Sequence, residues 1–301
     1  MPFAPVAPLA QGDRVAVVAP SGPFDRESFD QGLALVAQRY VPVFTDRLYQ
    51  KHRYLAGTDE ARLAELQAAV DDESVRAVFT ARGGYGAMRL LPALRLAGRP
   101  PRPLVGFSDV TALHAVAQLA GWRSLHGPNL THLATQPRDV VERLFALLEG
   151  RAVPPLAGTT ALIPGTAEGP LVGGNLSVFT RLLGTPFLPP RQGALLFLED
   201  VGERPYRLDR MWTHLRLAGA LDGLIGLVLG DFNNCEEPGG DYSCLEVLTA
   251  LAKEIGLPCA AGFPVGHGAV NHPLPLGARV RLNATAARRD FVEPLVEGGT
   301  A

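Results

Sequence analysis

The chain has 301 residues, 47% of them hydrophobic and 19% charged, so it can fill the cores of about two domains. Its formal net charge of −2 excludes the strongly basic surface that marks a nucleic-acid-binding protein. No apolar run reaches the roughly 18 residues of a membrane span, and the N-terminal stretch lacks the basic and apolar regions of a secretory signal. We therefore expect a cytoplasmic protein that binds neither nucleic acid nor membranes.

Strand and helix signals alternate through the first half of the chain. Residues 14–20 (RVAVVAP) form a compact apolar run, typical of a strand that is buried on both faces. Thr58 or Asp59 can cap a later helix, and Gly121 stands just past the expected end of another. This alternation predicts an α/β fold with a mostly parallel, flavodoxin-like sheet and helices on both faces. Strands are expected over residues 14–20, 41–45, 75–81 and 104–107, and helices over about 29–36, 59–70, from 87, 109–120 and 138–148.

The composition changes near residue 150. Residues 150–168 are rich in Pro, Gly, Ala and Thr without a period, which is typical of an interdomain linker. Beyond it, apolar runs at 194–200 and 224–230 predict strands, with an amphipathic helix between them and an alternating strand over 278–284. We expect three parts: a domain over 1–149, the linker over 150–168, and a mixed α/β domain over 169–301.

Ser108 lies in the stretch LVGFSDVTALH (104–114), at the end of an expected strand and the start of an expected helix. One interpretation is an ordinary helix N-cap, for which serine is a preferred residue. The other is a nucleophile on a sharp turn, although Val110 replaces the second glycine of the G-x-S-x-G pattern. For such a nucleophile, the amide of Asp109 at the helix start could bind a developing oxyanion. The local sequence leaves both interpretations open.

A serine nucleophile needs a base and a group that orients the base. His267 lies between two glycines in PVGHG and is the first candidate; His126 and His272 are the alternatives. Glu199 ends the apolar run 194–198, where a carboxylate is costly unless it is paired or at the rim. It is either a solvent-facing strand terminator or the acceptor that fixes the histidine tautomer.

The RGGYG loop (82–86) lacks the third glycine of a dinucleotide fingerprint, and no Walker lysine follows it. Adjacent glycines instead suit a backbone that brings an N–H close to a ligand, which makes the loop a candidate for the second oxyanion donor. Residues 231–234 (DFNN) and the scattered histidines show no metal-ligand spacing, and the three cysteines form no C-x-x-C pair. We assign no metal and no cofactor.

Seven blocks occur in an order that resembles the LD-carboxypeptidase family of serine peptidases, the muramoyl-tetrapeptide carboxypeptidases. The resemblance covers the chain from Gly12 to about Ala284. The blocks are GDRVAVVAPSGP, ARGGYGAMRLLP, VGFSDVTALH, HGPN, GGNLSVFTRLLGTPF, FLEDVGERPYRLDR and GFPVGHGAVNHPLPLG.

The resemblance implies roles for individual residues. Ser108 matches the family's nucleophile, Glu199 its acid and His267 its base, while Gly84 and the Asp109 amide match the oxyanion donors. His126 is then left with a structural or substrate-side role. A cation is needed for the substrate carboxylate, and Arg82 is a candidate that could equally make a structural ion pair.

The resemblance also implies an activity. The expected reaction is hydrolysis of the amide between an L-centre (diaminopimelate or lysine) and a terminal D-alanine in a murein tetrapeptide during cytoplasmic cell-wall recycling, by a homodimer. One alternative within the family is a microcin C immunity-like peptidase that cleaves aminoacyl-nucleotide analogues. A second, from another class, is a non-catalytic protein that binds a small ligand through its glycine-rich loops.

Overall fold

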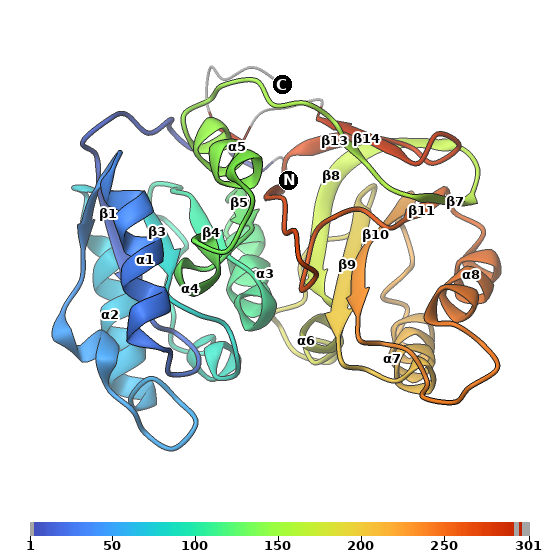
Figure 1. The fold of residues 1–301 in the computed structure, drawn as a ribbon, viewed down its shortest axis with the longest axis horizontal. Coiled ribbons are helices and arrows are strands. Elements are labelled where there is room, and N and C mark those ends of the chain that lie inside the picture. The colour runs from blue at the N-terminus through green and yellow to red at the C-terminus, as the bar shows by residue number, and fades with distance from the viewer. Residues whose placement is uncertain (1–2, 292–294, 297–301) are drawn as a thin grey trace.

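The computed structural model describes residues 3–291, 295 and 296, and it arranges them around two β-sheets that lie side by side (Figure 1). The first sheet has the order β12-β5-β4-β3-β1-β2, in which β1 to β5 are parallel and β12 is antiparallel to β5. Its parallel part has the flavodoxin-like order 2-1-3-4-5 that the sequence predicts. The strands are β1 (Arg14–Val18), β2 (Val41–Val43), β3 (Val75–Thr80), β4 (Leu104–Gly106), β5 (Ser124–His126) and β12 (Leu274–Leu276).

Both faces of this sheet are covered because its strands are apolar on both sides. In β1, Val15 and Val17 pack into one core with the helices α1, α4 and α5, while Ala16 and Val18 pack into another with α2 and α3. The helices are α1 (Arg26–Ala37), α2 (Asp59–Asp71), α3 (Thr111–Leu119), α4 (Leu130–Leu133) and α5 (Arg138–Leu148), with 3₁₀ turns over Asp46–Tyr49, Ala87–Leu90 and Ser108–Val110.

The second sheet has the order β6-β14-β13-β8-β9-β10-β11-β7. Its centre, β8 to β11, is parallel, and the outer strands are antiparallel, so it is the mixed α/β unit expected from the sequence. The strands are β6 (Leu156–Ala157), β7 (Thr160–Ile163), β8 (Thr166–Asn175), β9 (Leu195–Val201), β10 (Gly226–Asn233), β11 (Cys259–Ala261), β13 (Arg279–Asn283) and β14 (Arg288–Phe291), with helices α6 (Leu176–Thr180), α7 (Pro205–Leu217) and α8 (Cys244–Ile255).

Several details differ from the sequence expectations. The expected helix from residue 87 is one 3₁₀ turn, and α8 was not expected although Ser243 and Glu246 form a capping box at its start. The segment 150–168, expected to be a linker, contains β6 and β7, which pair within the second sheet. β12, from late in the chain, joins the first sheet. The proposed domain boundaries stay a prediction.

The two halves contact each other where α3 meets the end of β8 (Figure 1). The backbone N–H of Asn175 donates to Thr111 Oγ1 over 2.9 Å, and Gln118 Nε2 donates to the Leu171 carbonyl over 3.2 Å. Gly174 permits this approach, because a Cβ there would lie 2.5 Å from Thr111 Oγ1. The helix that follows Ser108 is therefore fixed directly against the second sheet.

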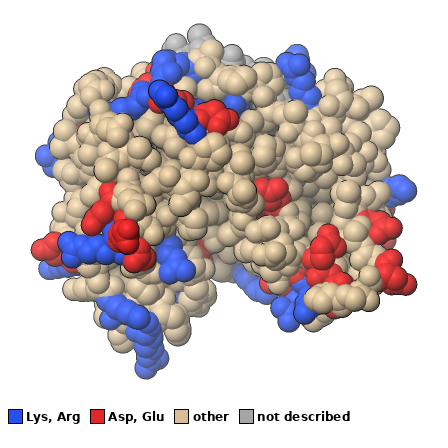
Figure 2. Space-filling model, viewed as in Figure 1, with Lys and Arg blue, Asp and Glu red and all other residues tan. Residues whose placement is uncertain are grey.

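The outer surface carries no large patch of one charge on the face shown in Figure 2, where basic and acidic side chains lie beside one another around the rim. Within the described residues, no helix is both long enough and apolar enough to cross a bilayer.

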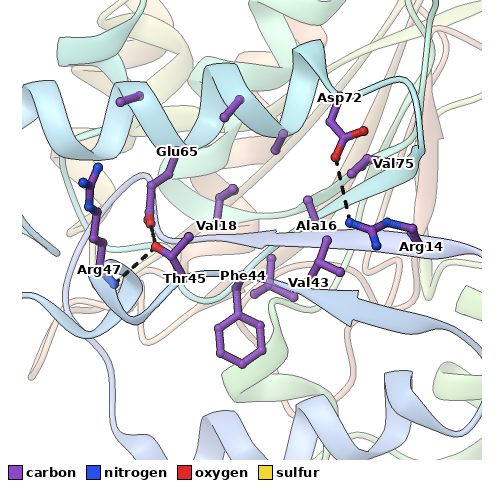
Figure 3. Close-up of a pocket in the computed structure, with 14 residues that line it drawn as sticks. Arg14, Ala16, Val18, Val43, Phe44, Thr45, Arg47, Glu65, Asp72 and Val75 are labelled. Carbon is purple, nitrogen blue, oxygen red and sulfur yellow. Dashed lines mark hydrogen bonds and ion pairs between the residues drawn. The ribbon is translucent and has the colours of Figure 1, made fainter.

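A cavity of about 330 Å³ lies between α2 and the edge formed by β1 and β2 (Figure 3). Its walls include Ala16, Val18 and Val43, and Arg14 lies 4.0 Å from Asp72 at one end. None of its lining residues belongs to the loops that carry the candidate functional residues. The cavity is therefore a feature of helix-on-sheet packing and is separate from the candidate residues Ser108, Glu199 and His267.

Candidate active site

Ser108 lies in a strained turn between β4 and α3. Its φ is 68°, in the left-handed region, which costs a non-glycine residue roughly 1–2 kcal/mol. Phe107 occupies the N-cap position, and no side chain caps this turn, so the helix-cap interpretation of Ser108 is wrong. The turn is braced by Asn129, whose Oδ1 accepts from the Phe107 N–H (3.3 Å) and from Thr80 Oγ1 (2.6 Å).

Asp109 ties three strand-end loops together. Its side chain is only 2% exposed and accepts hydrogen bonds from Ser21 Oγ (2.6 Å) and from the Ala87 N–H (2.8 Å). Burial raises the pKa of Asp109, and the hydrogen bonds from Ser21 and Ala87 oppose that rise. The loops after β1, β3 and β4 thus meet at one edge of the sheet, and Asp109 is the side chain that joins them.

The RGGYG loop packs directly on the Ser108 turn. A Cβ at Gly83 would lie 2.8 Å from Ser108 Cβ, so only glycine allows this approach. Gly84 has a φ of 107° and lies against Gly22, and its N–H donates to no acceptor in the described part of the chain. The loop therefore packs against the serine through Gly83, and the amide of the next residue, Gly84, has no acceptor in the described part of the chain.

Glu199 and His267 form a hydrogen-bonded pair in the second half. Glu199 Oε2 lies 2.6 Å from His267 Nδ1, and the carboxylate is fully buried at the carboxyl end of β9. Burial acts to lower the pKa of His267, but the hydrogen bond and charge of Glu199, with the charges of Asp200 and Asp231, outweigh it and raise the pKa. The pair therefore favours an imidazole that holds a proton more readily than a free histidine.

The pair faces the Ser108 turn across the interface between the two halves. The ring of Phe107, the residue before Ser108, lies with its centroid 4.8 Å from that of His267. Ser108 Oγ and the His267 ring are not hydrogen-bonded to each other among the described contacts. Such a bond is often long before substrate binds and shortens in the reacting complex.

The alternative bases occupy different surroundings. His126 is fully buried beside the ring of Phe197, and neither of its ring nitrogens has a hydrogen-bond partner among the described residues. Burial holds its pKa well below the ordinary value. His272 Nε2 lies 4.0 Å from Asp139 Oδ2, on α5. His126 therefore lacks, within the described residues, the hydrogen-bonded carboxylate that His267 has.

Arg82 is exposed, and its Nη1 donates to the Pro23 carbonyl over 2.5 Å. This contact joins the RGGYG loop to the loop after β1. It leaves the guanidinium at the surface near the site, and the substrate-binding role of Arg82 stays a prediction.

Three residues near His267 were not singled out from the sequence. Asn233 Nδ2 donates to the His267 carbonyl over 2.9 Å, and Asn271 Oδ1 accepts from the Gly266 N–H over 3.0 Å. Asp231 lies beside Gly268. Asp231 and Asn233 belong to the DFNN run (231–234) at the end of a buried strand. A polar run in that position is a sequence signal for a site, but its spacing argues only against metal binding. In the part of the chain that the structure describes, no group of three or more His, Cys, Asp or Glu residues is placed to hold a metal ion.

The arrangement has components that a serine hydrolase uses: a serine on a strained turn, a glycine loop packed against it, and an imidazole paired with a buried carboxylate. The chain belongs to the LD-carboxypeptidase family, whose N-terminal domain matches residues 15–127 and whose C-terminal domain matches residues 168–282.

Full-length relatives support this membership. The chain is 39% identical to a putative carboxypeptidase of Synechocystis sp., over 95% of this chain and 96% of the relative. It is 36% identical to a probable murein peptide carboxypeptidase of Bacillus subtilis, over 97% and 95%. It is 35% identical to a murein tetrapeptide carboxypeptidase of Pseudomonas aeruginosa, over 91% and 94%.

Solved structures have the same fold. The muramoyltetrapeptide carboxypeptidase from Oxalobacter formigenes superposes with a TM-score of 0.81 at 27% identity, covering 92% of this chain and 97% of that one. The microcin C7 self-immunity protein MccF superposes with a TM-score of 0.86 at 23% identity, over 98% and 100%. The second likeness concerns the fold alone.

Proposed function

We propose that this protein is a serine-type LD-carboxypeptidase that hydrolyses the amide between an L-centre, diaminopimelate or lysine, and the terminal D-alanine of murein tetrapeptides. The observation that carries the proposal is the buried Glu199–His267 pair, which faces the strained Ser108 turn in a chain of this family. The names of the Bacillus and Pseudomonas relatives support the substrate class.

In the proposed reaction, His267 removes the proton of Ser108 as the hydroxyl attacks the carbonyl carbon of the scissile amide. Glu199 accepts the Nδ1–H of His267, so Nε2 is the nitrogen that faces the serine. The fully buried carboxylate stabilises the imidazolium that forms. The N–H groups of Gly84 and Asp109 hold the negative oxygen of the tetrahedral intermediate.

The second half of the reaction uses the same groups. His267 gives its proton to the amine of the leaving D-alanine, and a water that His267 deprotonates then releases the acyl group from Ser108. The raised pKa of His267 suits a residue that must alternate between base and acid. Arg82 is the cation that we assign to the free carboxylate of the substrate.

The proposed setting is cytoplasmic recycling of murein peptides by a homodimer. Both the location and the oligomeric state come from the family resemblance. Sedimentation or light scattering of the purified protein tests the dimer, and a mass of one chain, about 32 kDa, would contradict it.

The substrate assignment is tested by incubating the protein with a murein tetrapeptide that ends in D-alanine and with its all-L counterpart, following alanine release. We expect release from the first and little from the second. A folded protein that releases alanine from neither would contradict the assignment.

A second candidate is cleavage of an aminoacyl-nucleotide analogue, which the fold shared with MccF favours. Competition between the tetrapeptide and a processed microcin C analogue for the same enzyme separates the two. A specificity constant that is higher for the analogue would favour the second candidate.

A further inference from the structure

The two glycines that flank His267 each lie against a different carboxylate. A Cβ at Gly266 would lie 2.6 Å from Glu199 Oε2, and a Cβ at Gly268 would overlap the carboxylate of Asp231. Glu199 lies near the end of β9 and Asp231 near the end of β10, and these strands are parallel neighbours. The histidine loop is therefore packed between two acidic side chains, and it has glycine at the two points of closest approach.

Asp231 contacts this loop through both its backbone and its side chain. Its N–H donates to the Val265 carbonyl over 2.9 Å, and its carboxylate lies against Gly268, whose N–H acts to lower the pKa of Asp231. Two residues further along β10, Asn233 Nδ2 donates to the His267 carbonyl over 2.9 Å. Strand β10 thus holds the loop at Val265, before His267, and at the peptide between His267 and Gly268, while Glu199 on the next strand holds the ring.

Asp231 also contributes charge to the same imidazole. Burial raises the pKa of Asp231 to about 6, and the nearby Glu199 adds to that rise, while the Gly268 N–H and His267 oppose it. The other charged or titratable groups that act on His267 are Glu199 and Asp200 from β9, His126 from β5 and His132 from α4. The two histidines have pKa values that burial lowers, so they are neutral when His267 titrates.

We propose that Asp231 is a positioning residue for the reaction: its carboxylate lies against Gly268 and holds the His267 loop in place, and it puts a second carboxylate beside the Glu199–His267 pair. This inference rests on the proposed role of His267 as the base. In it, Glu199 sets the tautomer and the direction of the ring, and Asp231 sets the position of the loop and raises the pH at which the ring loses its proton.

The two contributions of Asp231 can be separated by two substitutions. Asp231→Asn removes the charge but keeps an oxygen that can accept from the Gly268 N–H. Asp231→Leu removes both the charge and the accepting oxygen. Losing a neighbouring negative charge destabilises the imidazolium, so both variants should lower the pKa of His267, by about 0.5 pH unit or more. Only Asp231→Leu should also release the loop.

The experiment is an NMR titration of the His267 ring, assigned by its disappearance in His267→Gln, together with hydrogen exchange of the Gly268 amide and the pH profile of kcat/KM. We expect Asp231→Asn to move the ring titration and the acid limb of the profile to lower pH by the same amount. Asp231→Leu should in addition speed Gly268 exchange and lower kcat by about tenfold or more.

Asp200→Asn is the matched comparison, because Asp200 also acts on His267 by charge but hydrogen-bonds to Asn175 and the Ser177 N–H instead of the loop. It should shift the titration and leave Gly268 exchange at the wild-type rate. An unchanged His267 titration in Asp231→Asn, or wild-type exchange in Asp231→Leu, would overturn the proposal. The titration needs no substrate, so a protein that fails to release D-alanine would contradict the proposed function and leave this test intact.

Discussion

In the N-terminal half, Ser108 is held by backbone geometry: its own φ of 68°, a glycine packed against its Cβ, and a turn braced by Asn129. In the C-terminal half, His267 is held by charge: a hydrogen bond of 2.6 Å to the fully buried Glu199, with the carboxylate of Asp231 against the adjacent Gly268. Substitutions in the two halves should therefore impair activity in different ways. Substitutions around Ser108 should act through shape, and those around His267 should act through the pH dependence.

The largest effect tests whether the two halves work as one unit. Ser108→Ala and His267→Ala should each lower kcat by about 10³-fold or more, and the double variant should lose little beyond either one, because groups that act together do not contribute additively. Steady-state kinetics of the three variants provide the measurement. Additive losses would mean that Ser108 and His267 act independently and would break the proposed triad.

Two further variants sharpen this test. Glu199→Gln should lower kcat less than His267→Ala does, because the glutamine amide still accepts a hydrogen bond but lacks the charge that stabilises the imidazolium. His126→Phe should keep most of the turnover. Both ring nitrogens of His126 are buried without a hydrogen-bond partner among the described residues, so a phenyl ring can replace the imidazole without leaving another polar group unpaired. Loss of activity in His126→Phe with a normal melting curve would make His126 the base.

An intermediate effect on kcat is expected for a substitution that changes only the packing around Ser108. Gly83→Ala places a methyl group 2.8 Å from Ser108 Cβ and 3.2 Å from the Phe107 carbonyl, so the serine or the loop must move. We expect kcat to fall by about 10- to 100-fold, since displacements near 1 Å have effects of that order. The pH at half-maximal kcat/KM should not change, because no charge near His267 is altered.

Gly22→Ala is the control for this prediction, because its methyl group would meet the Gly83 carbonyl at 3.3 Å, a tight but tolerable distance. Gly22→Ala should lower kcat less than Gly83→Ala does. A shift of the pH profile in Gly83→Ala would show that the two halves are not separable in the way described above.

The parallel sheet could be predicted from the sequence because its signals are local. Each buried strand is a short apolar run, and each following helix carries a cap or a terminating glycine, such as Thr58 and Gly121. The loops that follow parallel strands must meet at one edge, so the neighbourhood of Ser108 and the RGGYG loop followed from topology alone.

The remaining features depend on contacts between distant residues. Nothing in the apolar run of β12 shows that it leaves its own half and pairs with β5. The left-handed φ of Ser108 likewise could not be predicted from the sequence, because serine at a helix start usually indicates a cap. Asp231 and Asn233 lie in a polar run at a strand end, which can mark a site, but their partner is the backbone of a loop more than 30 residues away, so the sequence does not show what they bind.

The smallest effect concerns stability and isolates the strain at Ser108. Ser108→Gly should raise the free energy of unfolding by about 1 kcal/mol, because glycine adopts a φ of 68° freely, and this gain exceeds the extra chain entropy that glycine loses on folding. Ser108→Ala keeps the Cβ and should not be stabilised, although both variants lack the hydroxyl and should be equally inactive. Denaturant unfolding of the two inactive variants therefore compares the turn with and without strain at equal chemistry. Equal stability of Ser108→Gly and Ser108→Ala would mean that the turn stores no strain, and that the N-terminal half does not hold its serine by backbone geometry alone.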